Sequence, residues 1–273
     1  MPGLAYTALG MAALAAGDAV AAQSATAAAR LHATGAPPGM AALSRAFSAQ
    51  AALAGGDLGA ARDMADEAVA TAAGWYSMWA LTTRARVAFA QDEPARAERD
   101  AHDALACATE FDARLGISDA LESLAAVASD AGDLREAARL FGAGDAIRQR
   151  LGEVRFGVWD SDYQASLAAL RDALGNNDFD TAWAEGTALS TEEAIAYAQR
   201  GHGERKRPTS GWASLTPAER DVDRLVSEGL TNNDIATRLF VSPRTLQTHL
   251  THVYSKLGLT SRVQLVQEAG RHG

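Results

Sequence analysis

The chain has 273 residues, 48% of them hydrophobic and 22% charged, a balance that argues against disorder and is typical of a globular protein. Aromatic residues make up only 6% and alanine is abundant, which favours helices packed through small side chains over β-sheets. The single cysteine, Cys107, excludes an internal disulfide framework and fits a reducing cytoplasm, while the six histidines form no cluster that could hold a metal ion. We therefore expect an all-α, cytoplasmic protein without a metal site or a cofactor.

The net charge of -9 is unevenly distributed along the chain. Residues 200–273 hold 11 Lys and Arg against 7 Asp and Glu, a net charge of +4. Residues 1–199 hold 14 against 27, a net charge of -13. This asymmetry is typical of a polyanion-binding unit attached to an acidic body.

The N-terminal stretch "MPGLAYTALGMAALAAGDAVAAQSA" is apolar and rich in alanine, as a secretory signal peptide would be. It lacks the basic residues with which a signal peptide opens, and no apolar run reaches the length that spans a membrane. We therefore expect neither secretion nor a membrane anchor.

Helical stretches within residues 1–199 begin at similar short turns that contain Gly or an acidic residue. The turns are centred on Asp18, Asp57, Glu93 and Asp133, and a degenerate fifth copy follows at Asp178. The first four are spaced by about 40 residues, the period of helix-turn-helix solenoids, with Gly closing one helix and the acidic residue capping the next. These stretches resemble tetratricopeptide-like repeats, so residues 1–199 are predicted to form a helical repeat domain. An irregular helical bundle with similar loops is the alternative.

Three aromatic residues, Trp75, Tyr76 and Trp79, lie close together in this region. Trp75 and Trp79 fall on one helical face, which predicts that the cluster belongs to the core of a repeat. A ligand-holding aromatic cup is the alternative interpretation. Either way the region offers a surface, to which we expect an unidentified protein or small-molecule effector to bind.

Residues 200–211 are predicted to be a flexible linker, because "GHGERKRPTSG" is rich in residues that break regular structure. Arg205, Lys206 and Arg207 concentrate positive charge there. We interpret them as a solvated charge run, with phosphate contact as the alternative.

Capping signals divide residues 212–273 into four short helices. They are the capping box of Thr216 to Glu219, a second cap at Thr231 to Asp234, Ser242 before Pro243, and the box of Ser261 to Gln264, with Gly229 and Gly258 as helix stops. Apolar residues spaced by three, four or seven predict one buried face on each helix: Leu215, Val222, Leu225 and Val226; Ile235, Ala236 and Leu239; Leu246, Leu250, Val253 and Leu257; Val263 and Val266. The second and third helices are joined by "VS" alone, which is the layout of a helix-turn-helix DNA-binding unit.

The third of these helices, residues 243–257, is predicted to read DNA. With its leucines facing inward, its outer side presents Gln247, Thr248 and Thr251, whose amide, hydroxyl and methyl groups can contact base edges in the major groove. Phosphate contacts are predicted from side chains at the helix start and flanks, namely Ser242, Arg244, Thr245, His252 and Lys256. His249 lies nearer the core and is interpreted as a packing or hydrogen-bonding residue.

The motifs LTPxE, EGL, IA-x-x-L, SPRT-x-x-x-H and KLG follow one another between Leu215 and Val266. In this they resemble the C-terminal DNA-binding domain of the LuxR family of bacterial transcription regulators. The resemblance implies a four-helix domain whose third helix enters the major groove and which binds promoter half-sites of double-stranded DNA as a homodimer. It also implies dimer contacts from the fourth helix, for which Val263 and Val266 are the candidates. The segments "AARLFGAGDAIRQRLGEVRF" and "FDTAWAEGTALSTEEAIAYA" resemble the region before this domain in large actinobacterial LuxR-type regulators, in which a nucleotide-binding module precedes helical repeats.

Some residues depart from the family pattern. Gln247 replaces a residue that is usually basic or apolar, and Asp223 replaces a leucine at the edge of the buried face of the first helix. No Gly-Lys pair occurs, so a P-loop is absent from the sequence, and no catalytic motif is recognisable. We therefore expect a transcription regulator and not an enzyme. The alternatives are a repeat scaffold whose degenerate helix-turn-helix mediates protein association, and the C-terminal portion of a larger nucleotide-regulated protein.

Overall fold

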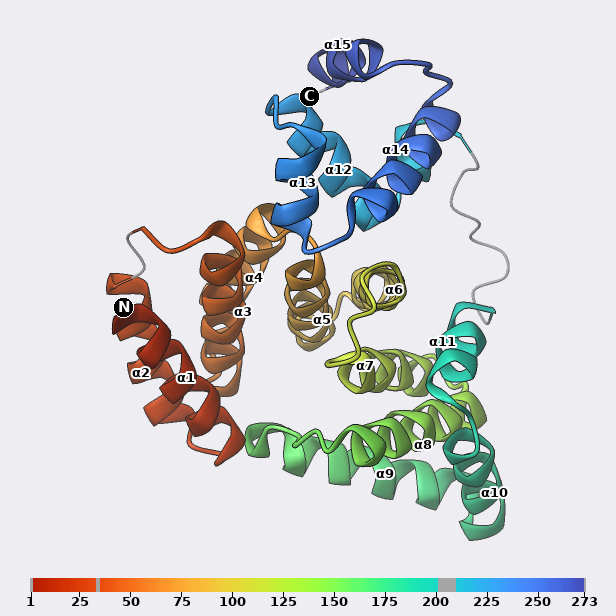
Figure 1. Cartoon of the computed structure of the whole chain (residues 1–273). Coiled ribbons are helices and arrows are strands. Elements are labelled where there is room, and N and C mark those ends of the chain that lie inside the picture. Colours follow the sequence, from red (N-terminus) through yellow and green to blue (C-terminus); the bar gives the residue numbers. More distant parts are fainter. Residues whose placement is uncertain (1, 33–34, 201–209, 273) are drawn as a thin grey trace.

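The computed structural model describes residues 2–32, 35–200 and 210–272, and every regular element in these ranges is helical (Figure 1). The predicted all-α class is confirmed. The helices before the predicted linker are α1 (Pro2–Ala15), α2 (Ala19–Leu31), α3 (Pro38–Ala54), α4 (Leu58–Thr71), α5 (Trp75–Ala90), α6 (Pro94–Glu110), α7 (Ile117–Asp130), α8 (Leu134–Leu151), the 3-10 turn η1 (Gly157–Trp159), α9 (Asp160–Leu174), α10 (Asn176–Thr187) and α11 (Thr191–Arg200). We call α1 to α11 the repeat domain.

The first eight helices form four successive hairpins, and each hairpin turns where the sequence predicted. Gly17, Gly56 and Gly132 adopt a positive φ in three of the turns, and Asp92 does so in the fourth. Asp18 and Asp57 cap the helices that follow, each accepting a backbone N–H three residues on. The fifth predicted copy differs, because Asp178 lies inside the first turn of α10 and not at its cap. Assignment of these hairpins to the tetratricopeptide class stays a prediction.

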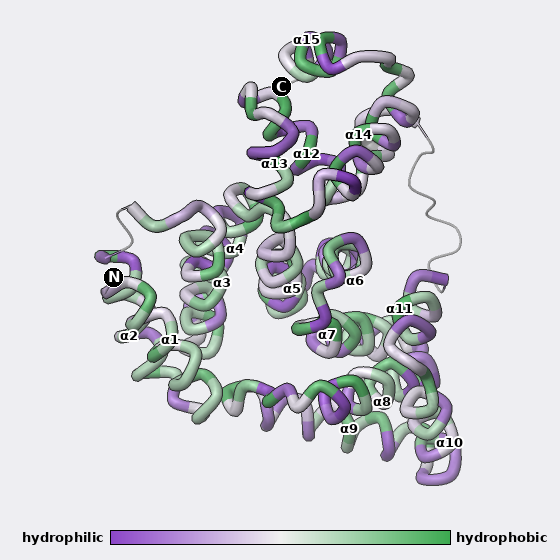
Figure 2. Tube along the Cα trace, in the orientation of Figure 1, coloured by the Kyte–Doolittle hydropathy of each residue, from purple (hydrophilic) through white to green (hydrophobic). Residues whose placement is uncertain are grey.

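The hairpins pack closely because the buried faces consist largely of alanine. Ala61, Ala65 and Ala68 of α4 and Ala97, Ala101 and Ala104 of α6 are almost completely buried. In Figure 2, α1 is green or white along much of its length, whereas α10 mixes purple with white and green. Of the predicted aromatic cluster, Trp79 packs into the core against Phe47, whereas Trp75 lies tilted against Tyr76 at the start of α5.

The repeat domain closes on itself (Figure 1), which the sequence did not predict. After α8 the chain returns through η1 to the end of α1, where Gly157 packs so tightly that an added Cβ would lie 2.8 Å from the Ala15 carbonyl oxygen. An aromatic contact supports this closure, since Phe47 of α3 lies against Phe156 with ring centroids 5.9 Å apart. Trp159 of η1 also donates a hydrogen bond to Gln50 of α3. The hairpins therefore form a closed ring and not an open array.

The C-terminal residues form η2 (Trp212–Ser214), α12 (Pro217–Ser227), α13 (Asn232–Leu239), α14 (Pro243–Leu257) and α15 (Arg262–His272). Both predicted capping boxes, at Thr216 and at Thr231, are present, and Gly258 ends α14 in the left-handed region. The predicted apolar faces of α12, α13 and α14 meet in one core.

The prediction for the fourth apolar face was wrong. Val263 and Val266 are exposed, by 66% and 40%, and Leu265 is the residue of α15 that is buried in the core. Apolar residues lie on two sides of this short helix, and the side that packs against α12 carries Leu265. Val263 and Val266 therefore form an exposed apolar surface.

The predicted linker is largely outside the described residues. Arg205, Lys206 and Arg207 fall in this part of the chain, and the proposed boundaries of the domains stay a prediction. Among the described helices, none is both long and apolar enough to cross a membrane.

Candidate nucleic-acid interface

A tight turn between α13 and α14 sets the direction of the predicted recognition helix. Phe240 ends α13 with a positive φ of 57°, and two residues later Ser242 precedes α14. The Ser242 hydroxyl oxygen accepts a hydrogen bond from the Thr245 backbone N–H over 3.0 Å. Because such a cap satisfies an otherwise unpaired N–H group, the helix over residues 243–257 forms as predicted.

The three side chains predicted to read bases lie together on the solvent-exposed face of α14. Gln247, Thr248 and Thr251 are all exposed, while Leu246, Leu250 and Val253 on the other side are buried. The Thr248 and Thr251 hydroxyls donate to backbone carbonyls one turn earlier, over 3.2 and 2.9 Å. Their methyl groups and oxygen lone pairs thus remain for an outside partner, and the Gln247 amide supplies both a donor and an acceptor.

The predicted phosphate contacts at the start of α14 share one end of this face. Ser242 and Arg244 are exposed, Thr245 is half-buried, and the hydroxyls of Ser242 and Thr245 lie 2.8 Å apart. The N-terminal end of a helix carries partial positive charge. Both this helix end and the Arg244 guanidinium can therefore bind an anion.

The other two predicted phosphate contacts lie beside a buried carboxylate. The Lys256 Nζ atom donates to Glu219 Oε2 over 2.6 Å, and His252 Nδ1 lies 3.9 Å from Glu219 Oε1. Glu219 is only 2% exposed and also accepts the Thr216 backbone N–H of the capping box. Lys256 therefore ties α14 to α12, a stabilising role that its sequence position did not reveal. Its contact with phosphate stays a prediction.

Residues 213–269 match the family described as bacterial regulatory proteins, luxR family. Two mycobacterial proteins, provisionally named HTH-type transcriptional regulators, from Mycobacterium tuberculosis and Mycobacterium bovis, are 60% identical to the chain over 271 residues. These residues are 99% of this chain but 31% of each relative. The oxygen regulatory protein NreC of Staphylococcus aureus is 32% identical over 81 residues, 30% of this chain and 37% of that protein. No solved structure matches the chain.

The C-terminal domain belongs to the LuxR family. Its four helices and the motifs that carried the resemblance lie within the matched residues, so the predicted family is confirmed. The chain spans about a third of the length of the mycobacterial relatives, 31%.

The LuxR-type domain is docked on the repeat domain through a buried carboxylate, Asp221. Its Oδ2 atom accepts hydrogen bonds from the Gly74 backbone N–H over 3.0 Å and from the Ser77 hydroxyl over 3.1 Å, both at the start of α5. Its Oδ1 atom accepts from Arg224 over 3.2 Å. Burial raises the pKa of Asp221, although these hydrogen bonds and Arg224 act in the opposite direction.

Gly74 allows the two domains to approach this closely. It has a positive φ of 64°, and a Cβ atom there would lie 2.8 Å from the Leu239 carbonyl oxygen at the end of α13. Arg224 reaches across the same contact and donates to the Ala72 carbonyl oxygen over 3.2 Å. The start of α5 therefore contacts both α12 and the end of α13.

A second set of contacts joins the end of α6 to the LuxR-type domain. Thr216 donates to Glu110 over 2.7 Å, and burial raises the pKa of that carboxyl group. Arg220 pairs with Asp103 over 3.1 Å. His249 packs against Phe111 with ring centroids 6.1 Å apart, and burial lowers the pKa of this histidine. The prediction of a packing role for His249 is thus confirmed, but its partner is in the other domain.

Sequence reasoning missed Asp221, although a signal was present. Asp221 follows Ala218 by three residues and precedes Leu225 by four, so it belongs to the buried face of α12. An acidic residue at that position needs a partner, and none is available on α12 beyond Arg224. Asp223, which the family pattern singled out, is half-buried.

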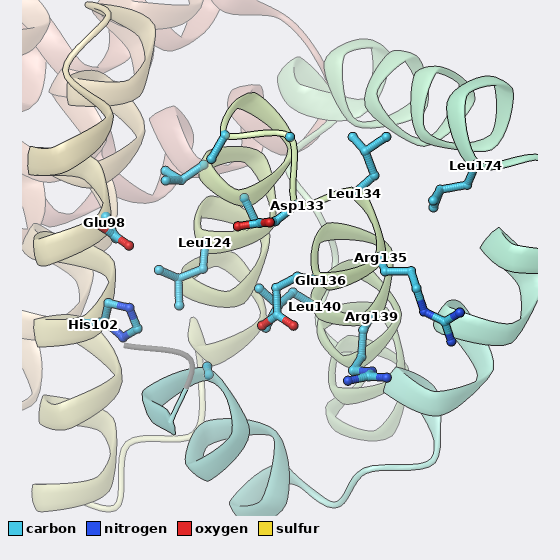
Figure 3. A pocket seen from close by; sticks show the side chains of 15 residues that line it. Glu98, His102, Leu124, Asp133, Leu134, Arg135, Glu136, Arg139, Leu140 and Leu174 are labelled. Atoms are coloured by element: carbon cyan, nitrogen blue, oxygen red, sulfur yellow. The ribbon is translucent and has the colours of Figure 1, made fainter. Parts of the chain in front are cut away.

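The repeat domain also contains a cavity of about 740 Å³ (Figure 3). Glu98 and His102 of α6 lie on one side of it, and Arg135 and Arg139 of α8 lie on the other. Both arginines pair with Glu185 of α10. Leu124, Leu134 and Leu140 also line the cavity, so its walls combine charged and apolar side chains from several helices of the ring.

Proposed function

We propose that the chain is a cytoplasmic DNA-binding transcription regulator, without enzymatic activity, whose α14 reads the major groove of promoter half-sites. The observation that carries this proposal is the position of Arg244, Gln247, Thr248 and Thr251. They form one exposed face of α14, while His249 on the other side of this helix packs against Phe111 of the repeat domain. The row of polar side chains is suited to contact base edges. The capped helix end beside it carries partial positive charge and is suited to contact phosphates.

The active species on DNA is proposed to be a homodimer. Val263 and Val266 leave an apolar surface on α15 that the repeat domain does not cover in the described structure, because both are exposed. A symmetric pair of recognition helices would match two half-sites one helical turn apart.

The repeat domain is proposed to bind a protein or small-molecule effector and to govern the LuxR-type domain through the docking contacts. The cavity in Figure 3 is large enough for a ligand of metabolite size, and the charged side chains among its apolar ones would select among such ligands. The hydrogen bonds of Asp221 and Thr216 supply a route by which a change in the ring could reach α12.

The test is selection of bound duplexes from a random pool with the full chain, followed by gel-shift titration at several salt concentrations. Arg244→Ala should weaken binding to all sequences and reduce the slope of log affinity against log salt by about 1. Gln247→Ala should instead change base preference at one position, by ~1 to 3 kcal/mol. Equal losses on every sequence for both variants would contradict the assignment of base reading to α14.

One observation favours a second candidate function, a scaffold in which the LuxR-type domain mediates protein association. Lys256 is held by the buried Glu219, so Arg244 carries most of the positive charge on the α14 face. A scaffold predicts no shift of any duplex even at low salt, whereas the regulator predicts saturable binding to the selected sequence.

A further inference from the structure

A separate cavity lies at the junction of the two domains. It has a volume of about 210 Å³ and is lined by Trp75 at the start of α5, by residues 111–115 between α6 and α7, and by Leu239 and Phe240 at the end of α13. Unlike the cavity in Figure 3, it has walls from both domains. A ligand in this space would contact both domains at once.

The walls of this cavity are mostly apolar and partly exposed to solvent. Phe240 is 68% exposed and Leu115 is 52% exposed, so two large apolar side chains lie uncovered at one place. The rings of Trp75, Phe111 and Phe240 come from three different segments, so they offer flat surfaces from several directions. Apolar surface of this kind gains free energy when a ligand covers it.

The backbone around the cavity is held in a conformation that is rare for residues other than glycine. Phe240 and Asp112 have φ angles of 57° and 47°, and they are two of the three such residues in the described part of the chain. Both line this cavity. Backbone strain of this type tends to occur at ligand sites and switch regions.

We propose that this junction cavity binds a small, flat, uncharged aromatic molecule of one or two rings, which stabilises the docked arrangement. The size follows from the volume, because an apolar cavity of about 150 Å³ accommodates benzene. The aromatic class follows from the three rings in the walls. The ligand is uncharged because the charged groups of the lining, Asp112 and Arg114, pair with each other at the exposed rim, 3.7 Å apart.

The junction cavity is a second ligand site, separate from the repeat cavity of the proposed function, and it rests on that function only for the consequence on DNA. The cavity exists only while the two domains are docked, so a ligand that fills it binds the docked state more tightly than the separated state. This difference in affinity shifts the equilibrium toward docking. A ligand in the repeat cavity alone would have no direct contact with the LuxR-type domain.

The test is titration of the full chain with 5-fluoroindole, followed by fluorine NMR. The parent chain should give a saturable shift with a dissociation constant of about 1 mM, as expected for a probe with so few heavy atoms. Phe240→Asn removes the ring while keeping a residue that tolerates a positive φ, and should weaken binding about tenfold. Leu115→Ala should weaken it about threefold.

The matched control is Leu31→Ala, which removes another highly exposed leucine, at the end of α2, that does not line the cavity. It should leave the affinity for 5-fluoroindole within about twofold of the parent, as expected for a distant site. Absence of a saturable shift in the parent, or equal losses in Leu31→Ala and Phe240→Asn, would overturn the proposal. Cyclohexanol, a flexible aliphatic ring, should bind at least about threefold more weakly than the aromatic probe.

Gel shifts on the same samples separate this proposal from the proposed function. A chain that binds 5-fluoroindole in the predicted manner but shifts no duplex keeps the cavity assignment and contradicts DNA binding. A chain that shifts duplexes and gives no saturable fluorine shift contradicts the cavity assignment alone.

Discussion

Removal of the Asp221 carboxylate should loosen the contact between the LuxR-type domain and the repeat domain. In Asp221→Ala the Ser77 hydroxyl can turn to another acceptor, but the Gly74 N–H is fixed by the backbone and loses its partner. A buried donor left without an acceptor costs about 1 to 3 kcal/mol, and we expect about 2 kcal/mol because one such donor is obligatory. Asp221→Asn keeps an acceptor oxygen for both donors and should cost less than about 1 kcal/mol.

Hydrogen exchange at the Gly74 amide measures this contact directly, because this N–H is the donor. A loss of about 2 kcal/mol should speed exchange by about thirtyfold in Asp221→Ala, if exchange proceeds through undocking. The control is Glu228→Ala, since Glu228 is another carboxylate that pairs with Arg224, over 3.3 Å, but is not an acceptor of the Gly74 N–H. Equal exchange rates in the two variants would refute the assignment of docking free energy to Asp221.

The raised pKa of Asp221 gives the same contact a defined pH dependence. Its pKa in the docked state lies above its ordinary value of 3.8, so between the two values the docked state binds more protons than the undocked state. The contribution of Asp221 to docking therefore increases as the pH falls through the pKa of the docked state. On acidification, protection of the Gly74 amide against hydrogen exchange should increase more in the parent than in Asp221→Asn. A smaller increase, or a decrease, in the parent would contradict the direction of the pKa shift.

Three further variants test other parts of the structure. Lys256→Ala should lower the free energy of unfolding by about 1 to 3 kcal/mol in urea, because it leaves the buried Glu219 without its cation, whereas Arg244→Ala should leave it unchanged. Val266→Asp should abolish cooperative binding to paired half-sites in gel shifts while single half-sites remain bound, and a monomeric parent on DNA would contradict this. Gly74→Ala should displace α13 from α5 and speed exchange at the Ser77 amide; unchanged exchange there would show that the close approach to Leu239 is not required.

The elements that the sequence predicted are those with local causes. The caps at Thr216, Thr231 and Ser242 depend on residues at most three positions apart, and the structure contains them as predicted. The turn glycines and the exposed face of α14 follow from backbone conformation and helical spacing in the same way.

The features that the sequence did not predict depend on contacts between distant residues. The sequence did not reveal the contact between Lys256 and Glu219, because Glu219 lies 37 residues earlier on another helix. Helical spacing alone could place either Val263 and Val266 or Leu265 on the buried side of α15. The position of α12 decides which side is buried. The docking of Asp221 on α5 joins residues separated by 147 positions, for which spacing along the chain carries no signal.

The closure of the ring between Gly157 and Ala15 changes how the repeat domain can respond to a ligand. In an open solenoid the terminal hairpin has one neighbour, so it can fray without disturbing the others. Here the α1–α2 hairpin is held by α3 on one side and by η1 on the other. We therefore expect a deformation of one hairpin to reach its neighbours on both sides, and through them the turns before α5 and after α6 that contact the LuxR-type domain.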